Sequence, residues 1–394
     1  MAKNPIRSTL LVLALKGLGL LLSYALLVAI AKLYGAKGTG LYNLTTNAVN
    51  LCAIAALLGM DGWMLRSAAP HVSTKLFWYQ VVKLLWIPTC VGILGLLVFA
   101  YWREGIMQSA LVIGCIFTPI VMGYVLAVEG LASRRLSVKS EFIRTFWRPA
   151  LILAGLFLIP TESIASPLWW AGLWTIVLLF AAWYFLFDGK KETTVLHVDL
   201  RVREIVGFWM MSLGGFALAN LLGFFVEWHL GMEEAGVLTV VVRIAQLASL
   251  SLLAVQVVWG PEISQSMPGE LITHKRKAIL MGMGLALIIG LGLWFIHPWL
   301  FNFFGPSWEG VGPYFLWILV GQVAYSASAG WMVFALMKGG ERHVGAGFLS
   351  LALLQVFLFA TSKNSEMFAI IHGVTFILLA LWNVFVGQRC TLES

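Results

Sequence analysis

The stretch that decides the fold is YGAKGTGLY, residues 34–42, a short break between two apolar runs. A similar break returns as HLGMEEAGVL, residues 229–238. Each holds two glycines five positions apart, Gly35 with Gly40 and Gly231 with Gly236. One shift of 196 residues, nearly half of the 394-residue chain, relates both pairs. The pattern indicates one structural unit that is written twice.

The same shift aligns further residues, namely Gly19 with Gly215, Asn47 with Arg243, Asn50 with Gln246 and Leu51 with Leu247. Chance matching between apolar helices is the alternative explanation. Two glycine pairs in register, with polar residues at the same depth, favour duplication.

The composition places the chain in a membrane. It is 60% apolar and 11% charged, whereas a soluble domain carries about 25% charged residues. Apolar runs of roughly 20 residues, each enough to cross the bilayer, recur from end to end. We expect spans near 9–31, 41–60, 76–101, 106–128, 142–160, 167–187, 206–228, 236–258, 279–297, 312–336, 345–361 and 367–387.

The predicted fold is therefore an all-α polytopic membrane protein of about twelve transmembrane helices in two six-helix lobes. Residues 1–187 form the N-terminal lobe, 188–205 a cytoplasmic linker, and 206–394 the C-terminal lobe with a short tail. Because each half has an even number of spans, both enter the membrane in the same direction. That predicts a parallel repeat about an axis along the membrane normal.

Lysine and arginine give the orientation. With the N-terminus inside, fourteen of these residues fall in or beside the cytoplasmic turns, and four fall on the opposite side. Both termini of this multi-pass membrane protein are therefore expected in the cytoplasm. The net charge of +8 is explained by this topology, and nucleic-acid binding is a poor explanation for it.

No predicted loop is long enough for an extramembrane catalytic domain. The sequence has no G-x-x-x-x-G-K-[ST], no H-E-x-x-H and no C-x-x-C, so it lacks the phosphate-loop, zinc-protease and redox motifs. The seven histidines are scattered. We expect a non-enzyme without catalytic residues, metal site or cofactor, except for a coupling ion such as H+ or Na+.

Basic residues inside spans carry the functional signal, since each costs roughly 2.5–3.5 kcal/mol at mid-helix on insertion scales. Lys16 lies in the first span and Arg243 in the eighth. Snorkelling of the long side chains to the headgroups is the alternative for both. In the fifth span only twelve residues run from Pro149 to Pro160, both included, so the helix must start near Glu141.

A helix that starts there has Arg144 and Arg148 in its first two turns. Like charges four residues apart repel by a few tenths of a kcal/mol. An anion bound by both arginines would turn this repulsion into a net attraction. The alternative is a positive flank in which Arg144 pairs with Glu141. Glu129 and Glu227 are candidates for carrying a coupling ion, or for balancing an arginine.

Three longer runs carry a resemblance: GLYNLTTNAVNLCAIAALLGMDGWMLR, AGVLTVVVRIAQLASLSLLAVQVVWGPEISQ, and FGPSWEGVGPYFLWILVGQ followed by MKGGERH. They resemble polysaccharide exporters of the multidrug/oligosaccharidyl-lipid/polysaccharide flippase superfamily, and most of all O-antigen-type (Wzx-like) lipid-linked oligosaccharide flippases. The family's basic residue in the eighth span falls on Arg243. The first-span basic position falls on Lys16, where related lipid II flippases tend to have arginine. Those relatives have fourteen spans, which argues against a peptidoglycan precursor as the substrate.

The resemblance implies two lobes in a V around a central cavity, with alternating access. It implies as substrate a polyprenyl-pyrophosphate-linked glycan of a lipopolysaccharide or other polysaccharide pathway, moved to the periplasmic leaflet. A glycan polymerase and ligase are then expected partners, besides the lipid bilayer. The substrate-binding candidates are Lys16, Asn47, Asn50, Arg144, Arg148, Arg243 and Gln246, where the uncharged amides suit sugar hydroxyls.

Three alternatives stay open. A drug/cation antiporter of the same fold would need buried carboxylates in its spans to bind a cation, whereas the deepest charges here are basic. A membrane glycan polymerase or ligase would need a substantial periplasmic loop for its acid/base groups. A purely structural scaffold would leave Arg243 unexplained. The sequence does not identify the glycan, the coupling ion, the oligomeric state or the resting conformation.

Overall fold

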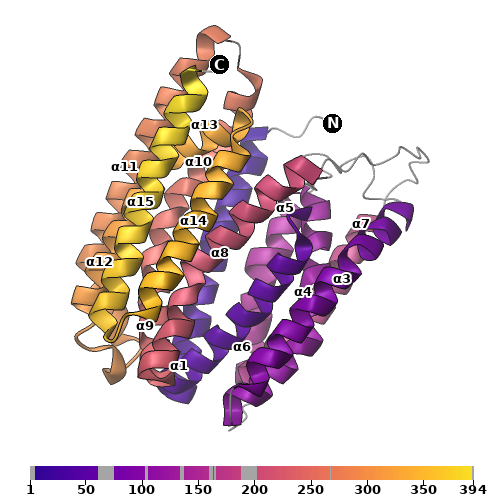
Figure 1. Cartoon of the computed structure of the whole chain (residues 1–394), viewed down its shortest axis with the longest axis vertical. Helices are drawn as coiled ribbons and strands as arrows, with labels where there is room; N and C mark the ends of the chain where they lie inside the picture. Colours follow the sequence, from indigo (N-terminus) through magenta and orange to yellow (C-terminus); the bar gives the residue numbers. More distant parts are fainter. Residues whose placement is uncertain are drawn as a thin grey trace. The chain divides into compact units, whose positions relative to one another are not determined.

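The computed structural model describes residues 5–60, 75–102, 105–133, 137–158, 163, 166–187, 202–266 and 268–392, which form helices joined by turns (Figure 1). In the first half these are α1 (Pro5–Leu57), α3 (Lys75–Tyr101), α4 (Gly105–Ser133), α5 (Ser137–Glu141), a π-helix η1 (Phe142–Trp147), α6 (Arg148–Leu158) and α7 (Ser166–Phe187). In the second half they are α8 (Val202–Leu230), α9 (Met232–Ala245), a 3₁₀ turn η2 (Gln246–Ser249), α10 (Leu250–Gln265), α11 (Pro268–Asn302), η3 (Pro306–Trp308), α12 (Gly312–Ala327), α13 (Ala329–Met337), α14 (Glu341–Ala360) and α15 (Ser365–Leu392).

The all-α membrane fold of about twelve transmembrane helices is confirmed. Within the described part of the chain, nine helices are long and apolar enough to span a membrane, or ten if α12 and α13, bent by 42°, are one span. Two further predicted spans are not included in that count, for local reasons. The 53-residue helix α1 contains two spans joined at a kink, and the fifth span is interrupted by η1.

The chain divides into two compact units. The first comprises Met1–Tyr34 with Leu41–Leu213, and the second comprises Gly35–Gly40 with Gly214–Ser394. Within the first unit α4 packs against α3 and α7, and within the second α15 packs against α12 and α14 (Figure 1). The predicted linker 188–205 lies outside the described residues up to position 201, and from Val202 the chain is helical. The predicted lobe boundaries and the symmetry axis stay predictions.

The two glycine corners share one backbone geometry. Gly35 has φ 67° and ψ −170°, and Gly231 has φ 97° and ψ 174°. A side chain would be strained at these positive φ values, which glycine adopts readily. The predicted spans leave residues 32–40 and 229–235 between them, and the structure is helical over most of these residues. Each break is a single residue, because the polar residues after it resume the helix, as in the Thr39 hydroxyl bond to the Gly35 carbonyl at 2.9 Å.

The second glycine of each corner explains why the pair is repeated. Within the second unit, a Cβ on Gly40 would lie 2.4 Å from the carbonyl oxygen of Met232, and one on Gly236 would lie 2.0 Å from that of Ala36. The contact is reciprocal, since each glycine faces the carbonyl four residues before the other. The two corners pack backbone to backbone, and only glycine permits that approach.

Elements at the same place in the two halves also have comparable contacts. Gly19 packs on Thr145 in the fifth span, and Gly215 packs on Phe348 of α14, the fifth span of the second half. The Tyr34 hydroxyl lies 3.3 Å from Ser166, which opens α7. Correspondingly, Ser365, which opens α15, donates a hydrogen bond to Glu234. These contacts favour duplication over chance.

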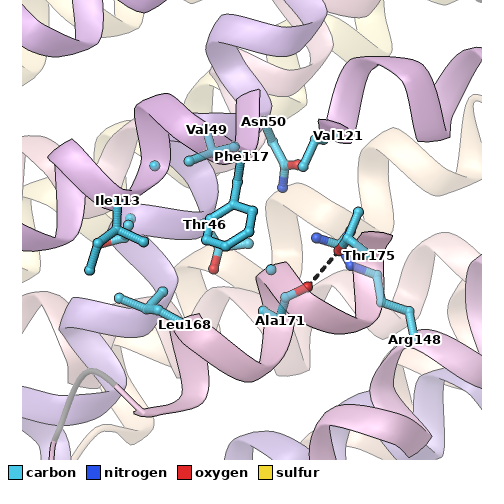
Figure 2. Close-up of a pocket in the computed structure, with 13 residues that line it drawn as sticks. Thr46, Val49, Asn50, Ile113, Phe117, Val121, Arg148, Leu168, Ala171 and Thr175 are labelled. Carbon is cyan, nitrogen blue, oxygen red and sulfur yellow. Dashed lines mark hydrogen bonds between the residues drawn. The ribbon is translucent and has the colours of Figure 1, made fainter. Parts of the chain in front are cut away.

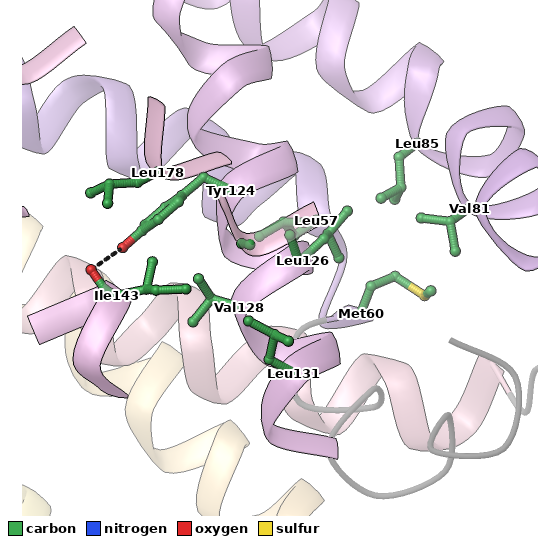
Figure 3. Close-up of a cluster of buried hydrophobic side chains, with 12 residues drawn as sticks. Leu57, Met60, Val81, Leu85, Tyr124, Leu126, Val128, Leu131, Ile143 and Leu178 are labelled. Atoms are coloured by element: carbon green, nitrogen blue, oxygen red, sulfur yellow. Dashed lines mark hydrogen bonds between the residues drawn. The ribbon is translucent and has the colours of Figure 1, made fainter. Parts of the chain in front are cut away.

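The core of the first unit lies where α1, α3, α4 and α7 meet η1 (Figure 3). Leu57, Leu85 and Leu131 are fully buried there. The buried Tyr124 hydroxyl donates to the Ile143 carbonyl at 3.3 Å, which ties α4 to η1. This core fixes the segment that carries Arg144 and Arg148.

Candidate functional site

The fifth span is helical from Ser137 to Leu158, but its hydrogen-bond pattern changes at η1. Pro149 gives the physical reason, because proline has no N–H to donate to the Thr145 carbonyl one turn earlier. That carbonyl faces α1 at Gly19, where a Cβ would lie only 2.4 Å away. The sequence correctly predicts a helix starting near Glu141, and it misses the π-helical turn. Such turns often mark functional sites.

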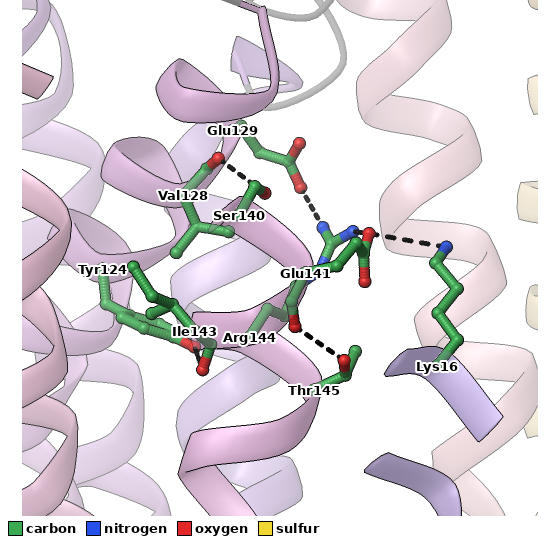
Figure 4. Close-up of polar contacts among 9 residues, drawn as sticks. All are labelled: Lys16, Tyr124, Val128, Glu129, Ser140, Glu141, Ile143, Arg144 and Thr145. Carbon is green, nitrogen blue, oxygen red and sulfur yellow. Dashed lines mark hydrogen bonds and ion pairs between the residues drawn. The ribbon is translucent and has the colours of Figure 1, made fainter. Parts of the chain in front are cut away.

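Four charged side chains form one cluster in the first unit, the charge quartet of Lys16, Glu129, Glu141 and Arg144 (Figure 4). Arg144 donates to Glu129 Oε1 at 2.5 Å and also to Glu141 Oε1. The Lys16 ammonium lies 3.5 Å from the same Glu141 oxygen. Two cations are thus balanced by two carboxylates from three helical segments.

The quartet is mostly buried, and hydrogen bonds from neighbouring hydroxyl groups to backbone carbonyls hold its segment in place. The Glu141 side chain is 7% exposed, and that of Arg144 is 37% exposed. The Thr145 hydroxyl donates to the Glu141 carbonyl at 2.7 Å, and Ser140 donates to the Val128 carbonyl at 3.0 Å (Figure 4). These bonds hold the start of the fifth span against α4. The alternative in which Arg144 pairs with Glu141 is the arrangement observed, and a second carboxylate comes from Glu129.

Arg148 lies in a different setting, at a pocket between α1, α4, α6 and α7 (Figure 2). The pocket is open on one side, and the figure of about 390 Å³ for its space outside protein atoms includes open solvent. We call it the Arg148 pocket, and its lining is Thr45, Thr46, Val49, Asn50, Ile113, Gly114, Phe117, Val121, Arg148, Leu168, Ala171, Gly172 and Thr175. Arg148 is the one charged residue among these.

Three polar groups of the Arg148 pocket have spare bonding capacity. Among the described residues Arg148 contacts no carboxylate, and its guanidinium lies 6.0 Å from the centre of the Tyr124 ring. The Thr45 hydroxyl is buried without a hydrogen-bond partner in the described structure. Asn50 reaches toward the pocket from α1 (Figure 2). Buried polar groups are usually paired, so this pocket has the character of a ligand site.

In the second unit Arg243 is held by amides. Its guanidinium donates to Asn220 Oδ1 at 3.2 Å and lies 3.5 Å from Gln246 Oε1. Gln246 in turn donates to the Ala219 carbonyl at 3.3 Å, and it begins the 3₁₀ turn η2. Arg243 and Gln246 are therefore brought together as expected. Asn220 was missed, because no spacing along the sequence links it to a residue 23 positions away.

The remaining predicted residues lie apart from these contacts. Asn47 is buried on α1 and makes polar contacts of its own, but it does not line the Arg148 pocket. Glu227 lies near the end of α8, where its carbonyl accepts from Gly231 at 3.0 Å. No group of three or more metal-ligating side chains is found within the residues that the structure describes.

No family model and no curated protein matches the chain. Solved structures do match it in fold. One is MATE in complex with MaL6, at TM-score 0.68 and 13% identity over 99% of this chain and 97% of that one. Another is a multidrug resistance MATE family transporter of the MOP superfamily in an outward-facing conformation, at 0.66 and 13% over 99% and 97%. A third is the lipid II flippase MurJ in an inward closed conformation, at 0.69 and 12% over 98% and 90%. The likeness shows that this chain has the fold of these proteins.

Proposed function

We propose that the protein is a flippase. It moves a polyprenyl-pyrophosphate-linked oligosaccharide from the cytoplasmic to the periplasmic leaflet by alternating access. The proposal includes a bacterial inner-membrane location with both termini in the cytoplasm. Its expected partners are the bilayer and the polymerase and ligase that use the same glycan.

The Arg148 pocket is the observation that carries the proposal. A guanidinium with no carboxylate partner in the described structure is a ready site for phosphate, because its planar N–H groups match two phosphate oxygens at once. Asn50 and the Thr45 hydroxyl add uncharged hydrogen-bonding groups. This combination suits a phosphate joined to a sugar.

The pocket walls fit the same class of molecule. Val49, Ile113 and Phe117 form an apolar surface beside the polar groups. A sugar ring has apolar faces and hydroxyl edges, and a polyprenyl tail can stay in the bilayer while the head crosses. The fold match to a lipid II flippase supports the proposal, since that protein's name states a lipid-linked substrate.

The second candidate is an ion-coupled multidrug or cation antiporter. The fold match to a multidrug resistance MATE family transporter favours it. The charge of the pocket opposes it, because a cation would meet Arg148, with no carboxylate among the lining residues. The two candidates therefore predict opposite responses to a change of charge at position 148.

Transport by the purified protein in liposomes tests the proposal. The probe is a short polyprenyl pyrophosphate carrying one fluorescent N-acetylhexosamine, followed with an impermeant quencher, and ethidium is the cationic comparison. Arg148→Gln should abolish flipping of the pyrophosphate probe, and Arg148→Lys should keep part of it. Lys139→Gln is the matched control, because Lys139 is an exposed basic residue of the same segment that lies over Phe185. Ethidium transport that increases in Arg148→Gln, without probe flipping by the wild type, would favour the antiporter.

Arg243, Gln246, Lys16 and Asn47 stay proposed contributors to substrate binding. The contacts of Arg144 with Glu129 and Glu141 favour the alternative in which Arg144 balances carboxylates. For Arg243 the rival hypothesis is a permanent pair with Glu227. That pair predicts that Arg243→Glu combined with Glu227→Arg restores flipping, whereas a substrate contact predicts no rescue. Full flipping activity in Arg243→Gln would eliminate both. Glu129 and Glu227 remain proposed carriers of a coupling ion.

A further inference from the structure

We propose that the second unit binds an anionic phospholipid, with the phosphate at Arg389 and the acyl chains on the apolar face of α15. The site lies at the end of the unit where α11 begins and α15 ends. Lys275 of α11 donates to the Gly387 carbonyl at 2.9 Å. A Cβ on Gly340, which precedes α14, would lie 3.0 Å from the Cys390 sulfur. The starts of α11 and α14 and the end of α15 therefore meet at one end of the unit.

Positive charge gathers at this end of the second unit. Its described lysines and arginines are Lys275, Arg276, Lys277, Lys338, Arg342 and Arg389, and its described carboxylates are Glu262, Glu270 and Glu341. Arg276, Lys277 and Arg389 are exposed, whereas Glu341 is buried. Basic residues at a membrane surface attract anionic lipids. An anionic headgroup is therefore the partner of complementary charge.

An apolar stripe leads along α15 to Arg389. Its large side chains are between 36% and 61% exposed, and they are Val374, Leu378, Leu381, Trp382 and Phe385. Steps of three, four and seven residues place them on one face of the helix with Arg389. At 1.5 Å per residue the stripe is about 16 Å long, which is roughly half of a 30 Å hydrocarbon core. The stripe thus matches one leaflet, and Arg389, one turn further on, lies at the depth of the lipid phosphates.

Trp382 is held at the boundary between α14 and α15, which pack side by side (Figure 1). Its indole N–H donates to the His343 carbonyl at 2.8 Å, and a Cβ on Gly347 would lie 2.1 Å from its ring. The Phe385 ring lies 5.8 Å from the Trp382 ring, centre to centre. Tryptophan favours the depth just below the headgroups. The two rings can therefore contact the upper acyl chains while the Arg389 guanidinium binds phosphate oxygens.

The stripe also distinguishes a phospholipid from a lipid-linked glycan. A glycan head needs side chains that hydrogen-bond to its hydroxyls. The stripe is aliphatic and aromatic, and its one polar hydrogen, the Trp382 N–H, already donates to the His343 carbonyl. Acyl chains fit such a surface, and a glycan does not. The proposal therefore does not rest on the proposed flippase function.

Native mass spectrometry of the purified protein in neutral detergent tests the site. Phosphatidylglycerol and phosphatidylcholine with the same acyl chains are added in equal amounts, and the bound lipid is counted. The wild type should prefer phosphatidylglycerol. Arg389→Gln should lower that preference about fivefold, as expected for one basic residue at a lipid surface, and Arg389→Lys should keep most of it. The matched control is Lys363→Gln, because Lys363 is an exposed basic residue at the opposite end of the same helix pair.

Three results of that measurement would overturn the proposal. They are no preference in the wild type, an unchanged preference in Arg389→Gln, and an equal loss in Lys363→Gln, which would mean that any exposed positive charge has the same effect. The fluorescent polyprenyl-pyrophosphate probe tests the other source of phosphate. It should bind Arg389→Gln as it binds the wild type, and a tenfold loss would assign the site to the lipid-linked substrate instead. The phospholipid measurement involves no transport, so it stands even if flipping is disproved.

Discussion

The charge quartet and the Arg148 pocket present the same side chain in opposite settings. Arg144 and Arg148 lie four residues apart on one helical segment. Arg144 contacts two carboxylates, whereas Arg148 faces a pocket with uncharged polar groups and apolar walls. Arg144 lies inside the π-helical turn η1, whereas Arg148 is the first residue of α6. Residue type and sequence spacing therefore do not decide which arginine can bind a ligand. The side chains that each arginine already contacts decide it.

The difference predicts different consequences of mutation. Removing one partner of a buried ion pair is costly, because the remaining charge has no compensation. Removing a cation that has no carboxylate partner leaves no such charge behind. The quartet should therefore govern stability, and the Arg148 pocket should govern ligand binding.

The largest expected effect is that of Arg144→Ala. It leaves the carboxylates of Glu129 and Glu141 without their shared cation, and both side chains are mostly buried. We expect a loss of about 3 kcal/mol, the low end of the range for breaking a buried pair, because Arg144 is itself partly exposed. The fraction of protein that stays monodisperse after heating, followed by size-exclusion chromatography with fluorescence detection, measures it.

The control for Arg144→Ala is the double variant that adds Glu129→Gln. It removes the carboxylate that Arg144→Ala leaves without a cation, keeps the Lys16–Glu141 pair, and should recover most of the lost stability. An Arg144→Ala protein as stable as the wild type would show that the quartet contributes nothing to stability, and the contrast with Arg148 would lose its basis.

Two glycines give the next largest contrast. A Cβ on Gly19 would meet the Thr145 carbonyl at 2.4 Å, and a Cβ on Gly172 would meet the tip of the Phe117 ring at 2.1 Å. The backbone of the fifth span cannot move easily, so Gly19→Ala should lower the free energy of unfolding by about 2 kcal/mol, as overpacking does. The tip of a phenylalanine side chain can move by a change in χ1, so Gly172→Ala should cost less stability and instead fill the Arg148 pocket.

Thermal unfolding and probe flipping, measured on both glycine variants, check this contrast. Gly19→Ala should lower the unfolding temperature more, and Gly172→Ala should lower flipping more per folded molecule. The reverse order in either measurement would contradict the assignment of stability to one region and binding to the other.

How far the sequence predicts these regions depends on the kind of contact. Apolar runs and paired glycines predict the spans and both corners, because membrane thickness and positive φ are local constraints. The sequence also predicts the helix start near Glu141 and its i,i+3 contact with Arg144. It cannot predict that Glu129 completes the quartet, since this depends on how α4 and η1 are rotated about their axes. The π-helical turn is missed for a related reason, because its only local sign is Pro149.

The smallest expected effect is a gain in stability. The Thr45 hydroxyl is buried without a partner in the described structure, and Thr45→Val has nearly the same shape without the polar group. Replacing an unsatisfied buried donor should stabilise the protein by up to about 1 kcal/mol. The same variant should weaken probe binding modestly. A loss of stability in the heating experiment would mean that the hydroxyl has a structural partner, and Thr45 would then be dropped from the ligand site.

The central claim is that Arg148 binds the anionic head and that Arg144 is held by its carboxylates. Its most direct test is equilibrium binding of the fluorescent polyprenyl-pyrophosphate probe to protein in nanodiscs, compared between Arg148→Gln and Arg144→Lys. The second variant keeps the cation that the quartet needs. We predict that Arg148→Gln weakens binding by at least about tenfold, as expected for a lost charge-assisted contact of about 1.4 kcal/mol or more. Arg144→Lys should bind as the wild type does. Wild-type affinity in Arg148→Gln together with a tenfold loss in Arg144→Lys would contradict the account.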